Sequence, residues 1–435
     1  MRYSTRNRRR IKAKGPDEYE IMAAGCPLAL FALVGLTFDL LNLTVNVPAV
    51  ALEAVLAHVA ALFGLWRKPS AVKIAEILGG MEHDSLTRLV FKERWAARAI
   101  VAALAALAQC IGGMGYLVID DTCIVRPRGK KVEGAYWDYD HALGKSVLGY
   151  RMVTVLWVCG PWRIPLAFSF WHKRGARRKY RTKNEIARIL LAWVVRRIGP
   201  VTYVAFDSWY ANRKMFALCE ELGLEWVTRV RRNTKLTHGG RRLRADTIGR
   251  RLLKAARPYR RAVLSGGVAR KAVVNWGQMG PFGFVVLKDE LDGEKEGLRY
   301  LLSSSPDLSA AGIALRYKSR WEIEVFFESL KQHFWLNAYQ GRTLAGQRTY
   351  VALAFLAHVC AQYWSHSSGC SVAQVKDWAS RLWLIEDEAG EPHLTLVRRL
   401  RRDHLPRIAE AKEIVRNELP ELLHFQKPLI DFAAA

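Results

Sequence analysis

Hydrophobic positions follow two different patterns along this chain. Residues 1–110 carry Ala and Leu at helical spacing and predict a helical N-terminal region. From about residue 111 the apolar residues form short β-branched runs, which predict strands. These runs are Tyr116 to Ile119, Met152 to Val158, Ile164 to Phe170, Val201 to Phe206 and Glu225 to Val230. The chain is therefore expected to begin with helices and to continue with a sheet.

Helical spacing returns between the later runs, at 184–197 and 213–222. Three early strands followed by alternating helix and strand predict an α/β fold with a sheet of mixed direction. Residues 231–308 are Gly-rich and basic and predict a β-rich insertion. Its candidate strands are Tyr259 to Leu264, Ala272 to Trp276, Phe282 to Leu287 and Leu298 to Leu302.

Apolar helices are also predicted at 344–364 and 372–384, ahead of a charged tail that begins near Glu386. The expected organisation therefore has five parts. They are a helical region at 1–110, the first part of the sheet domain at 111–230, the insertion at 231–308, the completion of the sheet domain at 309–365, and a helical region with the charged tail at 366–435.

The N-terminal region contains the outline of a helix-turn-helix. Ser70 is a suitable N-cap for a helix at 71–78, Gly79 and Gly80 make a turn, and a second helix is predicted at 85–91. Arg88 and Lys92 would then be available to phosphate groups. Any two short helices joined by glycine give the same outline, so ordinary helix packing remains the alternative.

A predicted helix that contains residues 317–331 combines an apolar face with a chemically mixed one. At about 100° per residue, one stripe between roughly 300° and 360° carries four functional side chains. These are Tyr317, Arg320, Glu324 and Lys331. The apolar face, between roughly 180° and 280°, is made by Ile323, Phe326, Phe327, Leu330 and Phe334. A carboxylate flanked by cations suits phosphodiester chemistry, although an exposed face of mixed charge is the simpler interpretation.

The chain of 435 residues has a formal net charge of +27 and a pI near 10.0. Such a charge opposes compaction unless an anionic partner neutralises it, so nucleic acid is the first candidate and membrane lipid the second. The seven cysteines are scattered and form no CxxC pair, which argues against a disulfide framework and structural zinc. A reducing cytoplasm is the expected compartment.

The apolar segment 22–38 follows a basic cluster and raises the possibility of a membrane helix or signal peptide. It is shorter than the roughly 20 apolar residues that a span needs, and Asp39 follows directly. A buried helical domain, with no membrane partner, is the favoured interpretation.

Two of the predicted strands end in aspartate, at Asp120 and Asp121 and at Asp207. Ligands gather at strand ends in open α/β sheets, so these carboxylates meet if their strands are neighbours. Side chains alternate along a strand, so only one of the adjacent pair should face the site. Asp207 also fits a turn or an N-cap. On the predicted helix Glu322 points away from the stripe, whereas Glu328 shares it and competes with Glu324.

The Asp121-Thr122 pair, Asp207 and the spacing Tyr317-x2-Arg320-x3-Glu324-x6-Lys331 resemble the DDE transposases of bacterial insertion sequences. The resemblance covers roughly residues 70 to 365. It implies a ribonuclease H-like fold with a β-rich insertion before the glutamate helix. It also implies cut-and-paste transposition, in which a dimer cleaves terminal inverted repeats of double-stranded DNA and joins the freed 3′-hydroxyl to target DNA.

The resemblance favours Asp121 over Asp120 and implies Asp121, Asp207 and Glu324 as catalytic ligands of Mg²⁺ or Mn²⁺, with two ions. It assigns phosphate contacts to Tyr317, Arg320 and Lys331. Trp321 resembles aromatics that stabilise a flipped base in some relatives, although packing at a helix edge is the alternative. A cytoplasmic, nucleoid-associated location follows.

Basic segments supply candidate DNA contacts outside the signature. One lies between a strand and a helix and includes Arg177, Arg178 and Lys179. Phosphate contacts of this kind give salt-dependent binding without sequence specificity. Two competing interpretations remain open: a catalytically inactive DNA-binding protein derived from a transposase fold, and a hydrolase that acts on RNA with the same carboxylates.

Overall fold

The computed structural model describes residues 69–377, except for 79–81, 92–95, 128, 130, 141–142, 174–179, 256–267 and 289–296, together with parts of 54–62. The apolar segment 22–38, the predicted strand at 259–264 and the charged tail lie outside the described residues. The chain divides into two compact units. One comprises Met1–Cys110 and Ser329–Ala435, and the other comprises Ile111–Glu328.

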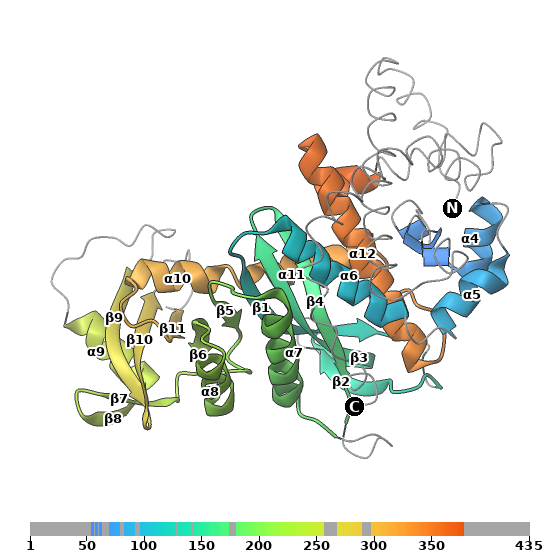
Figure 1. Cartoon of the computed structure of the whole chain (residues 1–435). Coiled ribbons are helices and arrows are strands. Elements are labelled where there is room, and N and C mark those ends of the chain that lie inside the picture. The colour runs from blue at the N-terminus through green and yellow to red at the C-terminus, as the bar shows by residue number, and fades with distance from the viewer. Residues whose placement is uncertain are drawn as a thin grey trace, which may run out of the picture. The chain divides into compact units, whose positions relative to one another are not determined.

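A mixed sheet forms the centre of the unit Ile111–Glu328 (Figure 1). Its first five strands lie in the order β4, β3, β1, β5, β6, and β1, β5 and β6 are parallel while β3 is antiparallel to both of its neighbours. These strands are β4 (Trp162–Trp171), β3 (Lys145–Cys159), β1 (Tyr116–Val125), β5 (Val204–Phe206) and β6 (Trp226–Val230). The predicted α/β, ribonuclease H-like sheet of mixed direction is confirmed.

The sheet continues beyond β6 through strands from the segment predicted as an insertion. The antiparallel strands β11, β10 and β9 follow in that order, and the hairpin of β7 and β8 contacts β9. Their bounds are β11 (Leu298–Ser303), β10 (Met279–Lys288), β9 (Val268–Trp276), β7 (Lys235–His238) and β8 (Arg241–Arg244), with α9 (Ala245–Lys254) after the hairpin. β2 (Tyr136–Asp140) pairs with the first residues of β3.

Helices cover both faces of this sheet. α7 (Lys183–Ile198) packs against β3 and β4, and its first turn is closed by a reciprocal capping box between Thr182 and Glu185. α8 (Arg213–Glu221) follows β5, and its Phe216 stacks on Trp226. α10 (Ala310–Lys318) lies across β6, β10 and β11 (Figure 1). Burial of these apolar faces supplies most of the stabilisation, because the hydrophobic effect scales with the area removed from water.

The prediction of one continuous helix through residues 317–331 is wrong. α10 ends at Lys318 and α11 (Trp321–His333) begins three residues later. Ser319 Oγ donates to Arg316 O at 2.6 Å and also pairs with Tyr203, while Arg320 N donates to Tyr317 O, three residues back. A serine side chain that bonds nearby backbone competes with helical hydrogen bonding, which accounts for the break.

The apolar face of α11 is confirmed. Ile323, Phe326, Phe327, Leu330 and Phe334 are all buried. Their helical spacing continues through the whole of α11, so the break before Trp321 does not alter which side packs on the core. The prediction therefore identified the buried face correctly and misjudged where the helix begins.

The second unit is helical in its described part. α4 (Ala71–Leu78) and α5 (His83–Phe91) contact each other, and α5 also contacts α12 (Leu344–Ser368). α6 (Ala96–Ile111) supplies a further row of buried alanines and leucines. Gly79 and Gly80 and Lys92 lie outside the described residues, so DNA binding by α4 and α5 stays a prediction. None of the helices that the structure describes is long and apolar enough to cross a membrane.

Candidate active site

Asp120 and Asp207 are brought together by the pairing of two parallel strands. Ile119 of β1 lies opposite Phe206 of β5, so the next residues, Asp120 and Asp207, follow in the same register at the carboxyl end of β5. Neighbouring residues in register project from the same face of a sheet. Burial raises the pKa of the Asp120 carboxyl most, and the charges of Asp121 and Asp207, which lie near it, raise it further.

Arg320 connects Asp120 to Glu324. Its Nη1 donates to Asp120 Oδ2 at 3.0 Å, and its Nη2 donates to Glu324 Oε1. Arg320 reaches β1 from the turn between α10 and α11, while Glu324 lies in the first turn of α11. The break between the two helices therefore places a guanidinium between two carboxylates from distant parts of the sequence. Burial works against a charged Arg320, but its acidic neighbours and the Tyr317 phenol raise its pKa further above the ordinary range.

The Asp120 carboxyl is only partly neutralised by Arg320. Burial is the largest cause that raises its pKa to about 7, the nearby charge of Asp121 is the next, and Arg320 lowers it. In addition, Arg320 Nε is buried and has no hydrogen-bond partner in the described part of the chain. A buried donor of this kind is costly unless a ligand or water bonds to it.

The geometry favours Asp120 over the predicted Asp121. Because side chains alternate across a strand, Asp121 points to the opposite face of the sheet, where α7 packs. There its carboxylate accepts hydrogen bonds from Lys183 Nζ at 3.0 Å and from the Tyr210 hydroxyl at 2.8 Å. Resemblance alone selected the residue next to Thr122, whereas the contacts place its neighbour beside Arg320 and Glu324.

Glu324 is also distinguished from the other acidic residues of its helix. Glu322 accepts a hydrogen bond from Arg163 Nε of β4 at 2.8 Å, in keeping with the prediction that it points away from the site. Glu328 is exposed one turn further along α11. Of these three carboxylates, Glu324 is the one joined through Arg320 to Asp120.

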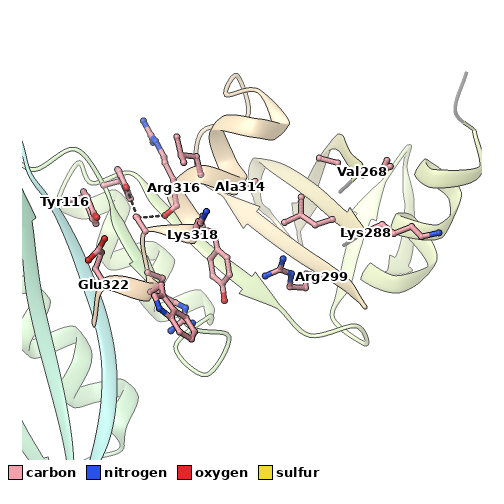
Figure 2. Close-up of a pocket in the computed structure, with 16 residues that line it drawn as sticks. Tyr116, Val268, Lys288, Arg299, Ala314, Arg316, Lys318 and Glu322 are labelled. Atoms are coloured by element: carbon pink, nitrogen blue, oxygen red, sulfur yellow. Dashed lines mark hydrogen bonds between the residues drawn. The ribbon is translucent and has the colours of Figure 1, made fainter. Parts of the chain in front are cut away.

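A groove of about 910 Å³ runs along the carboxyl-terminal half of α10 and reaches the site through Arg320, while Glu322 is the acidic residue that lines it. Figure 2 shows Tyr116 and Glu322 at one end of it and Val268 and Lys288 at the other. Its lining includes three predicted contact residues and several further cations. The predicted ones are Tyr317, Arg320 and Trp321, and the further cations are Lys288, Arg299, Arg316 and Lys318.

The predicted contact residues differ in their surroundings. The Arg320 guanidinium lies 5.6 Å from the centre of the Tyr317 ring, and burial raises the pKa of that phenol. Trp321 is 59% exposed, so packing in the core does not explain it. Lys331 lies on α11, two turns after Glu324, and is half-buried. Arg177, Arg178 and Lys179 lie outside the described residues, and their DNA contacts stay predictions.

Sequence reasoning missed the residues that surround Asp121. Lys183 is the first residue of α7, and Tyr210 lies in the turn after Asp207, where its amide donates to Asp207 O at 3.0 Å. Burial and the charge of Asp121 keep the pKa of Tyr210 well above its ordinary value, so its hydroxyl remains a donor. The capping pattern at 182–185 predicts where α7 starts, but only the packing of α7 on the sheet brings Lys183 to Asp121.

The residues of the site fit a divalent cation in their chemistry. Asp120, Asp207 and Glu324 offer carboxylate oxygens, which suit Mg²⁺ or Mn²⁺ better than zinc. Burial, and after it the charges of Asp121 and Asp207, raise the pKa of the Asp120 carboxyl, and a bound cation would favour its ionised form. Within the described residues no three His, Cys, Asp or Glu side chains already form a metal-binding group. Arg320, which contacts both Asp120 and Glu324, holds those two carboxylates instead.

Comparison with known families shows which superfamily this chain belongs to. A family model described as DDE superfamily endonuclease matches residues 51–273. The chain belongs to the DDE superfamily endonucleases. The match spans Asp120, Asp121 and Asp207, ends before α11 and Glu324, and assigns no role to any of these residues. No curated protein matches the chain significantly. Membership in this superfamily supports a nuclease class of enzyme and implies DNA as its substrate.

Proposed function

We propose that this DDE endonuclease is a transposase of a bacterial insertion sequence, which cleaves double-stranded DNA at terminal inverted repeats and joins the freed 3′ ends to target DNA. The observation that carries the proposal is the contact of Arg320 with both Asp120 and Glu324, beside Asp207 on the neighbouring strand. Three carboxylates and a guanidinium on one face are the groups that phosphodiester cleavage requires.

In this proposal Asp120, Asp207 and Glu324 hold the divalent cations. Bound Mg²⁺ or Mn²⁺ supplies Lewis-acid activation of the attacking oxygen and stabilisation of the leaving oxygen. Arg320 contributes its buried Nε–H, which is available to a phosphate oxygen. Tyr317 orients the guanidinium, because its ring lies directly beside it.

The groove along α10 is the proposed path of the DNA strand that enters the site. Lys318 and Arg299 are exposed in it, and Lys288 and Arg316 are half-buried. Cations in this arrangement bind the phosphate backbone irrespective of base sequence, and Trp321 offers an exposed ring on which a base can stack. Lys331 and the basic segment at 177–179 are proposed as further phosphate contacts, and the functional complex is proposed to be a dimer on two transposon ends.

The test uses a labelled duplex that carries the inverted repeat bordering the gene. We expect the wild-type protein to nick it in Mg²⁺ and the variants Asp120→Asn, Asp207→Asn and Glu324→Gln to bind it normally while losing at least roughly a hundredfold in cleavage rate. Glu328→Gln is the matched control, because it makes the same change on an exposed position of the same helix. Full cleavage by Asp120→Asn or Glu324→Gln would refute the assignment.

A second arm separates the alternatives. A catalytically inactive DNA-binding protein would bind the duplex without nicking it in either Mg²⁺ or Mn²⁺. A hydrolase of RNA would cleave an RNA/DNA hybrid in preference to the inverted repeat. Joining of the cleaved 3′ end to a supercoiled plasmid, detected as a covalent product, distinguishes a transposase from a simple endonuclease.

A further inference from the structure

Asp121 is held by several donors, although it does not face the proposed active site. Its Oδ1 accepts from the Tyr210 hydroxyl at 2.8 Å and from Lys183 Nζ at 3.0 Å, and its Oδ2 lies 3.2 Å from the same Nζ. Arg151 Nε of β3 lies 3.6 Å from Oδ2. The Asp121 side chain is only 10% exposed. A buried charge held by several donors is a structural fixture, because moving it would leave those donors unpaired.

These bonds connect α7 to β1 and to the turn after β5, which carry Asp120 and Asp207. Asp121 lies on β1 directly after Asp120, Lys183 opens α7, and Tyr210 lies in the turn that follows Asp207. Tyr210 is fully buried, and its amide donates to Asp207 O while its hydroxyl donates to Asp121. One tyrosine thus connects the backbone of one candidate metal ligand to the residue beside another.

The hydrogen bond from Tyr210 to Asp121 is important because the pairing of β1 with β5 ends before Asp207. β5 has only three residues, and its pairing with β1 stops at Phe206. Asp207 therefore lies just past the last pair of the ladder, where strand hydrogen bonds no longer fix the backbone. The Tyr210 hydroxyl bond to Asp121 is the described side-chain contact that ties this turn to β1.

We propose that Asp121, Tyr210 and Lys183 are positioning residues, which set the separation of Asp120 and Asp207 from the opposite face of the sheet. The inference rests on the proposed function, because it concerns the same carboxylates. It also gives the two adjacent aspartates different tasks. Asp120 contacts the reacting groups, and Asp121 holds the backbone that presents them. Partners of this kind, one shell outside metal ligands, typically change activity by tenfold to a hundredfold when removed.

The experiment compares Tyr210→Phe with the wild-type protein in single-turnover cleavage of the inverted-repeat duplex. Removal of one hydroxyl should lower the cleavage rate by about tenfold while the concentration of DNA at half-saturation stays unchanged. Tyr350→Phe is the matched control, since it deletes a buried hydroxyl that bonds to Trp335 O in the other unit. That control should cleave at the wild-type rate.

Asp121→Asn and the double variant Asp121→Asn with Tyr210→Phe complete the test. We expect the double variant to cleave no more slowly than Asp121→Asn alone, because both changes break one connection. Circular dichroism and DNA binding identify any variant that fails to fold, and in that case Tyr210→Phe, the mildest change, decides the outcome.

Each result has a definite meaning. Wild-type cleavage together with an unimpaired Tyr210→Phe would overturn the positioning role while leaving the proposed function intact. Loss of cleavage in Asp121→Asn as complete as in Asp120→Asn, with Tyr210→Phe unaffected, would make Asp121 a ligand and also overturn it. Failure of the wild-type protein to cleave would refute the proposed function itself.

Discussion

The pair formed by Arg320 and Asp120 gives the sharpest physical test of the site. We expect the double-mutant cycle of Arg320→Gln and Asp120→Asn to show a coupling free energy of about 2 kcal/mol in protein stability. The cycle isolates the interaction, because the bond of Arg320 to Glu324 is lost with Arg320 whether or not Asp120 is changed and therefore cancels. Both substitutions keep the side chains polar and similar in size.

The expected magnitude follows from distance and burial. Arg320 Nη1 lies 3.0 Å from Asp120 Oδ2, and the two side chains are 14% and 20% exposed. Two unit charges about 4 Å apart attract by about 4 kcal/mol at an effective dielectric constant near 20. Desolvation of both groups and the remaining contact with water offset part of this attraction, which leaves about half.

The assay is urea unfolding without divalent cations, followed by tryptophan fluorescence at a pH well above the Asp120 pKa of about 7, so that both groups are charged. The ion pair of Arg163 and Glu322 is the control cycle, because it has a shorter distance, 2.8 Å, but side chains that are 30% and 29% exposed. Exposed pairs contribute little, so that cycle should give at most about 1 kcal/mol. If the two cycles give the same coupling, the contact of Arg320 with Asp120 is an ordinary surface pair and the reasoning fails.

Two further predictions concern the scaffold. Gly149→Ala should lower the free energy of unfolding in urea by at least about 1–3 kcal/mol, because the added Cβ would lie 2.2 Å from Ile124 O. Gly144→Ala is the control and should cost less, because nothing lies within 4 Å of the added Cβ, although φ is 62°. Lys376→Met should weaken the dependence of stability on pH. Burial lowers the pKa of Lys376 from 10.5 to about 7, so the unfolded chain binds this proton more tightly than the folded chain. The free energy of unfolding of the wild-type protein should therefore rise as the pH increases from about 7 to 10.5, by up to about 5 kcal/mol. Melting temperatures at pH 7 and pH 10 measure the difference, and an unchanged pH dependence in the variant would contradict it.

Much of the sheet was accessible from the sequence because its strands are buried on both faces. β1, β3 and β4 are continuous apolar runs in the sequence, as is typical of strands buried on both faces. Ile119, Val155 and Leu166 of these strands are indeed buried. The same signal placed Asp207 correctly after its strand. Strands with polar or exposed residues gave no such signal, and β2, β7 and β8 were therefore missed.

The break between α10 and α11 could not be read from helical periodicity. Ser319 interrupts neither the apolar pattern nor the charge pattern, and serine is tolerated in many helices. What decides the break is tertiary: the Ser319 hydroxyl bonds to Arg316 O and pairs with the Tyr203 hydroxyl at 2.9 Å. Tyr203 is more than a hundred residues distant in sequence, so no local rule contains this contact.

The choice between Asp120 and Asp121 shows what a sequence pattern leaves open and what the contacts of the two side chains add to it. Alternation along β1 requires the two carboxylates to face opposite ways, but it does not say which face carries the chemistry. Arg320 and Glu324 arrive on the side of Asp120, and Lys183 and Tyr210 arrive on the side of Asp121. A cation site needs carboxylates whose charge is not already satisfied. The well-bonded member of the pair is therefore suited to hold the strand in place, and the incompletely balanced member to bind the metal.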